Sequence, residues 1–141
     1  MKKTFIVFSL TALLASCSSP KISLSDAMNL LKGNWALQSI AGQSGLGTLF
    51  ADKLPALQFD TEGMKVSGNN GCNNIRGPLS LEAGNKISFG QLAGTKMACP
   101  GQGEGIFMDA LNKVTNFKVD NGVMKLLAGE QEVMSFAKGS Q

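Results

Sequence analysis

Cys72 and Cys99 are the residues whose chemistry the sequence raises first. Cys72 lies in the stretch VSGNNGCNNIRG (residues 66–77), together with four asparagines, three glycines and the only arginine of the chain, Arg76. The two cysteines do not form a Cys-x-x-Cys motif, and the chain has no histidine that could generate a thiolate. Three interpretations remain at this point: a disulfide, two buried reduced thiols, or a reactive thiol.

The N-terminus indicates the compartment in which these thiols reside. Two lysines and the apolar run of residues 5–14 lead to the letters LASC, which end at Cys17. This pattern is typical of a secretion signal, and about ten apolar residues are too few to span a bilayer, which needs about twenty. LASC resembles the lipobox of bacterial lipoproteins. The resemblance implies a signal peptide of residues 1–16 and acylation of Cys17 by chains such as palmitate.

Lipidation of Cys17 would leave residues 17–23 as a tether and residues 24–141 as one domain. Several acyl chains hold a protein on a membrane essentially permanently, because each buried methylene adds about 0.8 kcal/mol. Ser18 follows the anchor, where many inner-membrane lipoproteins carry an aspartate, so we expect the outer membrane. An ordinary cleaved signal with an unmodified cysteine is the alternative.

An exported protein meets an environment that oxidises thiols. With Cys17 acylated, Cys72 and Cys99 remain as an even pair, which favours a disulfide. Closing a loop of 27 residues would stabilise the fold by roughly 3–4 kcal/mol in the chain-entropy treatment. The buried reduced thiols and the reactive thiol stay as alternatives.

Other chemistries find little support in the sequence. The absence of histidine removes histidine-based triads, histidine zinc sites and the commonest general base, and two thiols are too few for a cysteine metal site. Asp60 and Glu62 lie in an expected turn, and Glu104 would favour a helix N-terminus by its charge. The mature chain has eleven basic and ten acidic residues, a balance that argues against nucleic acid. We therefore expect no enzyme activity, cofactor or metal.

The pattern of the mature chain predicts a mainly β domain. Residues 22–33 read as a short helix that Ser23 or Ser25 caps and Gly33 ends. Turn signals then separate extended runs, which suggests an antiparallel barrel or sandwich of about eight strands. These runs are residues 34–40, 57–60, 64–68, 75–82, 86–93, 116–120, 123–129 and 132–138.

Residues 104–114 interrupt the strands with a helical pattern, and this helix would pack across the sheet. Its apolar stripe consists of Ile106, Phe107, Ala110, Leu111 and Val114. On the first strand, Trp35, Leu37 and Ser39 would share one face. The asparagines around Cys72 fit a turn, because asparagine bonds its own backbone and tolerates left-handed angles. Arg76 would pair with a carboxylate or a carbonyl, or lie exposed.

Five stretches together resemble the META domain of HslJ-like bacterial proteins over residues 33–137. They are GNWALQSIAG, PALQFD, VSGNNGCNNIRGPL, ISFGQLAGTKMACP and FMDALNKVTNFKVDNGVMKLL, and the pair GNNGCN and TKMAC is the most specific part. The resemblance implies a small antiparallel barrel-like fold with a helix laid across it and no known enzyme activity. The hallmark residues, whose family roles look mostly structural, are Trp35, Gly68, Gly71, Cys72, Asn73, Gly77, Thr95, Met97 and Cys99.

The chain departs from the family after Cys99, where Gly101, Gly103 and Gly105 replace better helix formers. Each glycine weakens a helix by about 1 kcal/mol, so we expect a looser or later helix start than in relatives. Relatives are linked to heat-shock induction, to novobiocin resistance and, by fold, to lipid-binding pilotins of type III secretion.

These observations favour a non-catalytic envelope lipoprotein that supports envelope stress or novobiocin-type antibiotic tolerance through a protein partner. The alternative is binding of an acyl chain or other small hydrophobic ligand in the barrel, which the flexible methionines would line. Those methionines more simply fill the core. A thiol oxidoreductase is the third hypothesis. The methionines concerned are Met64, Met97, Met108, Met124 and Met134.

Overall fold

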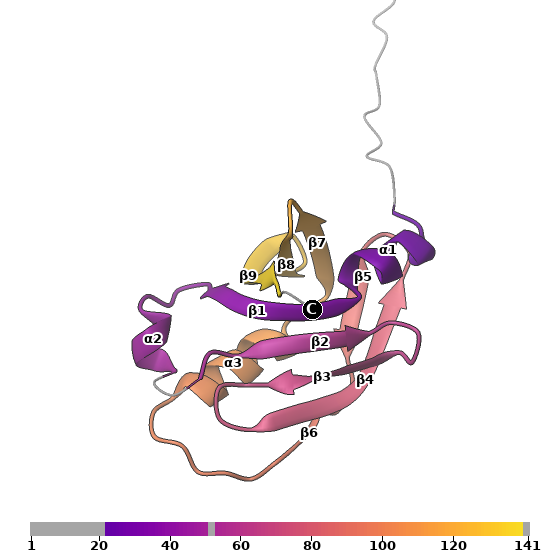
Figure 1. Cartoon of the computed structure of the whole chain (residues 1–141). Helices are drawn as coiled ribbons and strands as arrows, with labels where there is room; N and C mark the ends of the chain where they lie inside the picture. The colour runs from indigo at the N-terminus through magenta and orange to yellow at the C-terminus, as the bar shows by residue number, and fades with distance from the viewer. Residues whose placement is uncertain (1–21, 51–52, 140–141) are drawn as a thin grey trace, which may run out of the picture.

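The computed structural model describes residues 22–50 and 53–139 (Figure 1). The expected signal peptide, Cys17 and most of the tether therefore lie outside the described residues. Within these described residues, three helices and nine strands follow one another. In order they are α1 (Leu24–Leu31), β1 (Gly33–Ile40), α2 (Leu46–Leu49), β2 (Ala56–Asp60), β3 (Lys65–Asn69), β4 (Asn74–Glu82), β5 (Lys86–Phe89), β6 (Ala93–Gly94), α3 (Gly103–Asn112), β7 (Asn116–Asp120), β8 (Val123–Ala128) and β9 (Gln131–Lys138).

Eight of the strands close into an antiparallel barrel. The strand order is β3-β2-β1-β9-β8-β7-β5-β4, and β4 pairs back with β3 to complete the ring. The two-residue strand β6 pairs with β4 at Ile75 and Arg76, before the part of β4 that pairs with β5. The junction of β5 and β7 is narrow, because Lys86 and Asn116 are its single pair in register. The predicted mainly β, barrel-like fold is confirmed.

Alternating side chains from the strands fill the barrel with a single hydrophobic core. On β1, Trp35 and Leu37 are buried as predicted, but the register with β9 shifts between Leu37 and Ser39. After this irregularity Ile40 is buried and Ser39 is only partly so. The expectation that Ser39 shares the inner face is therefore wrong, because a local bulge changes which residues point inward.

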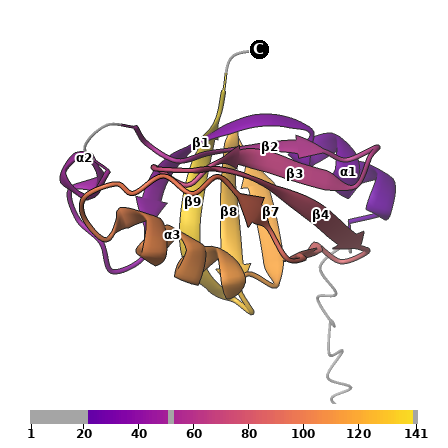
Figure 2. The ribbon, with the colours of Figure 1, turned by 90° about the horizontal axis from the view of Figure 1, so that it is seen from below.

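Helix α3 lies across the barrel wall formed by the C-terminal strands (Figure 2). Phe107 and Leu111 of its apolar stripe are buried, and the Phe107 ring meets Phe136 of β9 edge-on at a centroid distance of 6.4 Å. The helix begins at Gly103, one residue before the predicted range. A Cβ on Gly103 would lie 2.7 Å from the Phe50 ring, so this glycine permits close packing.

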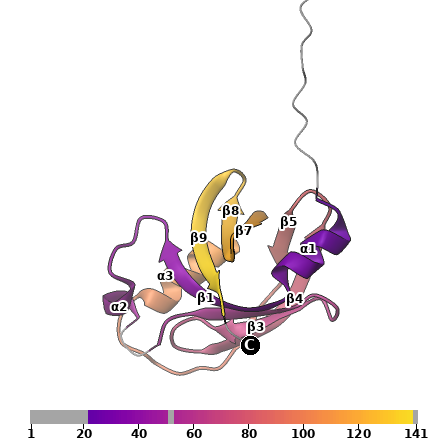
Figure 3. The same ribbon diagram turned by 45° about the horizontal axis from the view of Figure 1, so that its top comes forward.

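Helix α1 covers another part of the barrel, above β4 and β5 (Figure 3). Ser23 is its N-cap and accepts a hydrogen bond from the Asp26 amide at 3.2 Å. Ala27 and Leu31 of this helix are completely buried. None of the helices in residues 22–50 and 53–139 has the length and apolar character of a membrane span.

Two local features differ from the pattern expected from the sequence. The extended run of residues 86–93 is not one strand, because β5 ends at Phe89 and the chain bends before β6. A hydrogen bond of 3.1 Å from the Gly90 amide to the Pro78 carbonyl marks this bend. The short helix α2 was not expected at all, and it provides Phe50, which is buried directly after it.

Candidate functional site

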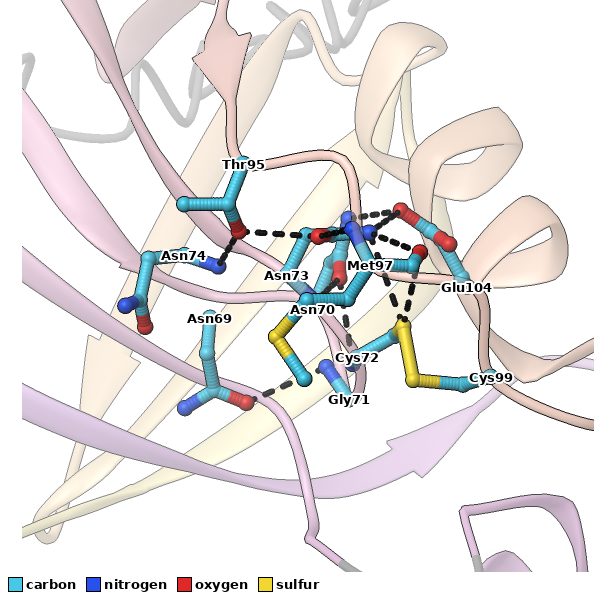
Figure 4. Close-up of a disulfide and its surroundings, with 10 residues drawn as sticks. All are labelled: Asn69, Asn70, Gly71, Cys72, Asn73, Asn74, Thr95, Met97, Cys99 and Glu104. Atoms are coloured by element: carbon cyan, nitrogen blue, oxygen red, sulfur yellow. Dashed lines mark hydrogen bonds between the residues drawn. A yellow bond between two sulfur atoms is a disulfide. The ribbon is translucent and has the colours of Figure 1, made fainter.

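The asparagine turn, residues 69–74, joins β3 to β4 and meets a second segment that is distant in the sequence (Figure 4). This second segment, residues 95–102, runs from β6 to α3 and is called the strap below. Cys72 of the turn and Cys99 of the strap form a disulfide, with a Cα–Cα distance of 5.8 Å. The structure thus contains the predicted pairing, in which neither sulfur is a free thiol.

Asn69 and Asn70 stabilise the turn from within, as predicted for asparagines in this context. The side-chain oxygen of Asn69 accepts a hydrogen bond from the Gly71 amide at 3.1 Å. The side-chain oxygen of Asn70 accepts from the amides of Cys72 at 3.2 Å and Asn73 at 2.7 Å. Both side chains are buried, so these bonds satisfy polar groups that water does not reach.

Asn73 has a different role, because its side chain leaves the turn and holds the strap. Its Oδ1 accepts hydrogen bonds from the Met97 amide at 2.7 Å and from the Thr95 hydroxyl at 2.8 Å. Its Nδ2 donates to the Met97 carbonyl at 3.2 Å and to Oε1 of Glu104 at 2.9 Å. Both hydrogens and both acceptor lone pairs of this buried amide are therefore used.

Glu104 connects the turn to α3. Its Oε1 accepts hydrogen bonds from the Nδ2 atoms of both Asn70 and Asn73, each at 2.9 Å. Glu104 lies in the first turn of α3, as expected from its charge. The sequence did not indicate these amide contacts, because the partners are more than thirty residues apart. The turn, the strap and α3 consequently form one hydrogen-bonded unit.

Thr95 closes the same unit at the β6 side. Its hydroxyl accepts from the Asn74 amide at 3.1 Å, and its own amide donates to the Asn74 carbonyl at 3.0 Å. Asn74 contributes these bonds through its backbone, and its side chain is exposed. Of the two neighbouring asparagines, only Asn73 therefore uses its side chain to bind the strap.

The motif glycines occupy places where a side chain would collide with a neighbouring element. A Cβ on Gly71 would overlap the Phe50 ring, and one on Gly68 would overlap the Ala56 carbonyl oxygen of β2. A Cβ on Gly77 would lie 2.7 Å from Cδ2 of Leu92. These three residues allow close packing around the turn and the bend that follows β5.

Trp35 lies apart from the asparagine turn. Its side chain is 1% exposed, and its Nε1 donates to the Leu31 carbonyl at 2.7 Å, which satisfies a carbonyl at the C-terminal end of α1. The Nζ atom of Lys138 lies 4.4 Å from the ring centroid. Burial lowers the pKa of the Lys138 ammonium group. Trp35 thus fixes α1 on the barrel.

The remaining candidate residues lie in a turn, in the core or at the surface. Asp60 accepts a hydrogen bond from the Gly63 amide at 2.9 Å in the turn where we expected it. Met124 and Met134 are completely buried and belong to the core, whereas Met97 is 62% exposed. In the described part of the chain, no group of three or more histidine, cysteine or acidic residues could hold a metal ion.

Solved structures with the same fold support this description. A protein from Burkholderia xenovorans, solved by NMR, is 25% identical with a TM-score of 0.63, and the match covers 96% of this chain and all of that one. A second NMR structure is 19% identical with a TM-score of 0.59, covering 79% of this chain and 92% of the other. A crystal structure of a duf4847 family protein from Bacteroides vulgatus is 16% identical with a TM-score of 0.55, covering 79% and 96%. No match was found among curated protein sequences.

Two family patterns match the sequence itself. The prokaryotic membrane lipoprotein lipid attachment site matches residues 1–18, a range that includes Cys17, and supports anchoring by an N-terminal lipid. The META domain matches residues 28–141, which comprise the whole barrel from β1 onward, the asparagine turn and the strap. This protein therefore belongs to the META domain family, in its lipid-anchored form.

Proposed function

We propose that this protein is a non-catalytic lipoprotein of the outer membrane that supports tolerance to envelope stress, including novobiocin-type antibiotics, by binding a protein partner. The observation that carries the proposal is that the Met97 side chain is exposed on a segment whose backbone is fixed. This side chain is 62% exposed, the most exposed of the large apolar side chains that are described, while the Met97 backbone is fixed by Asn73. Exposed apolar groups on a fixed segment favour recognition, because little conformational entropy is lost on binding.

The strap supports partner binding in a second way. Lys96, Met97 and Ala98 are consecutive exposed residues, and the disulfide holds the strap immediately after them. Asn73 and the disulfide therefore position a surface segment on which the Met97 side chain is exposed. Both motif cysteines are oxidised in this arrangement, which supports a role without thiol chemistry.

In-cell photo-crosslinking tests the proposal in the full lipidated chain. A benzophenone amino acid would replace Met97, and the matched control would replace Leu24, which is 43% exposed on α1. We expect a discrete crosslinked envelope protein at position 97 and none at position 24. Identical products at both positions, or no product at 97, would reject the strap as the binding segment.

A tolerance assay tests the cellular role separately. A strain that lacks this protein should be more sensitive to novobiocin, and the wild-type gene should restore growth. Met97→Asp should fail to restore it although the variant folds, because the substitution places a charge on the binding segment. Unchanged novobiocin sensitivity of the deletion strain would reject the proposed role.

A further inference from the structure

A groove lies on the outer face of β3 and β4, next to the asparagine turn. It is an open depression of about 1000 Å³ beside the turn of residues 61–64 and continues into a second depression of about 560 Å³ next to β6. Three residues line both parts: Ser67, Arg76 and Ala93. The combined surface is called the Arg76 groove below.

The strand register places Arg76 in the middle of this groove. Ser67 of β3 is its partner on one side and Ala93 of β6 is its partner on the other. Gln58 of β2 pairs in turn with Ser67, so four side chains follow one another across four strands on the same face. The Ser67 hydroxyl donates to Oε1 of Gln58 at 3.5 Å and can still accept a hydrogen bond.

The charges around Arg76 leave its guanidinium group available to a ligand. The ion pairs of the described residues all use lysine, namely Lys32, Lys86 and Lys125, so Arg76 has no carboxylate partner among them. Arg76 is exposed, and the sequence left open whether it pairs. Neither burial nor an ion pair therefore explains why an arginine stands at this position.

The groove favours an anion with a single charge. Its lining includes Arg76 and Lys65 as cations and Asp60 as the one acid, which corresponds to a net charge of +1. The Asp60 carboxylate is engaged with the Gly63 amide. A carboxylate carries one negative charge, whereas a phosphate monoester carries about 1.5 to 2 at neutral pH. The planar guanidinium also matches a carboxylate with two parallel hydrogen bonds.

The rest of the lining indicates a ligand of mixed polarity. Met64, Pro78 and Ala93 provide apolar contact beside Arg76. The side-chain amide groups of Asn74 and Gln91 can donate hydrogen bonds at the edges. We propose that the Arg76 groove is a binding site for the carboxylate group of a small organic acid or short peptide, with Arg76 as the residue that binds the carboxylate.

Saturation-transfer difference NMR tests this site with the full lipidated chain in phospholipid nanodiscs, and empty nanodiscs serve as the background. The probes are the peptide acetyl-Ala-Leu-Ala with a free C-terminal carboxylate, its C-terminal amide, 4-methylpentanoate and isoamyl phosphate. We expect saturable signals for the carboxylates and an affinity at least tenfold lower for the amide. The peptide acid and 4-methylpentanoate distinguish a peptide ligand from a simple organic acid.

Variants assign the binding to Arg76. Arg76→Gln should abolish the preference for acid over amide, and Arg76→Lys should retain only part of it, because a lysine lacks the planar fork. Lys118→Gln is the matched control, since it removes one exposed positive charge from β7 and should change nothing. No saturable signal with either carboxylate, equal binding of acid and amide, tighter binding of isoamyl phosphate, or normal binding by Arg76→Gln would each overturn the proposal. None of these outcomes depends on Met97, so the strap proposal is tested independently.

Discussion

The side-chain amide of Asn73 pairs with both backbone polar groups of Met97. Asn73 Oδ1 accepts from the Met97 amide at 2.7 Å, and Asn73 Nδ2 donates to the Met97 carbonyl at 3.2 Å. One side chain thereby substitutes for a neighbouring strand, because it presents a donor and an acceptor as a backbone does. The strap is held at this point although it has no strand partner of its own in the described structure.

Asn73→Ala should release the strap. The variant removes the bonds to Met97 and Thr95, and we expect a loss of about 2 kcal/mol in the free energy of unfolding, since the exposed strap can partly rehydrate. Hydrogen exchange of the Met97 amide should accelerate strongly. Asn74→Ala is the control, because only the Asn74 backbone takes part in the bonds. Slow exchange at Met97 in the Asn73 variant would contradict this role.

Replacing both Cys72 and Cys99 with serine should lower stability by about 3–4 kcal/mol, because the 27-residue loop is no longer closed. For a domain of this size, this loss corresponds to a fall in Tm of about 10–15 °C. A reductant should lower the Tm of the wild type and leave the double variant unchanged. The novobiocin assay at a temperature where the double variant is folded should show near-normal tolerance, because the hydrogen bonds of Asn73 still hold Met97. Loss of tolerance there, together with normal tolerance of Asn73→Ala, would indicate thiol chemistry and not release of the strap.

Gly71→Ala should destabilise the protein more than backbone strain alone explains. Gly71 has a φ of +94°, and the added Cβ would also collide with the Phe50 ring. Gly42 has a φ of +75° with nothing within 4 Å of an added Cβ. Gly42→Ala should therefore cost about 1 kcal/mol, and Gly71→Ala about 3 kcal/mol, because it adds the steric conflict. Urea unfolding of the two variants measures the difference, and equal losses would reject the packing argument.

Glu62→Gln should lower the pKa of Lys32. The hydrogen bond and the charge of Glu62 hold the pKa of this ammonium group above its usual value of 10.5. A raised pKa in the folded state means that the stabilising contribution is complete below pH 10.5 and is lost as the pH rises through the folded pKa. Because both side chains are exposed, the change in Tm at pH 7 should be too small to detect.

A ¹³C NMR titration of the Lys32 Cε resonance measures the pKa of that ammonium group directly. Glu130→Gln is the control, since Glu130 is exposed and takes part in no ion pair within the described chain. An unchanged Lys32 titration in the Glu62 variant would show that the pair does not persist in solution.

Local patterns were sufficient to predict most of the fold. Seven of the eight extended runs each correspond to one strand, and Ser23 caps α1 as one of the two predicted serines. The apolar stripe of α3 faces the core at Phe107 and Leu111. Side-chain alternation and helix spacing depend on neighbouring residues, so the sequence itself carries this information. The number of cysteines and the expected compartment were sufficient to predict the disulfide.

The features that the sequence did not reveal depend on contacts between distant segments. Asn73 resembles its asparagine neighbours in the sequence, yet only its side chain contacts residues of the strap. Gly103 weakens a helix by intrinsic propensity, but the approach of Phe50 requires it. The bulge after Leu37 is set by pairing with β9. The Arg76 groove requires β6 to lie beside β4, and a two-residue strand leaves no pattern to detect.

Closure of the ring has a consequence for a protein confined to a surface. A lipid anchor concentrates copies in two dimensions, where unpaired strand edges would encounter one another often and promote aggregation. Each of the eight ring strands has a neighbour on both sides, and among the described strands only β6 ends the sheet. That edge is two residues long, and the only other weakly paired backbone of the ring lies at the β5–β7 junction, where Lys86 and Asn116 are the single pair in register. The described part of the protein therefore offers other copies on the membrane little backbone to pair with.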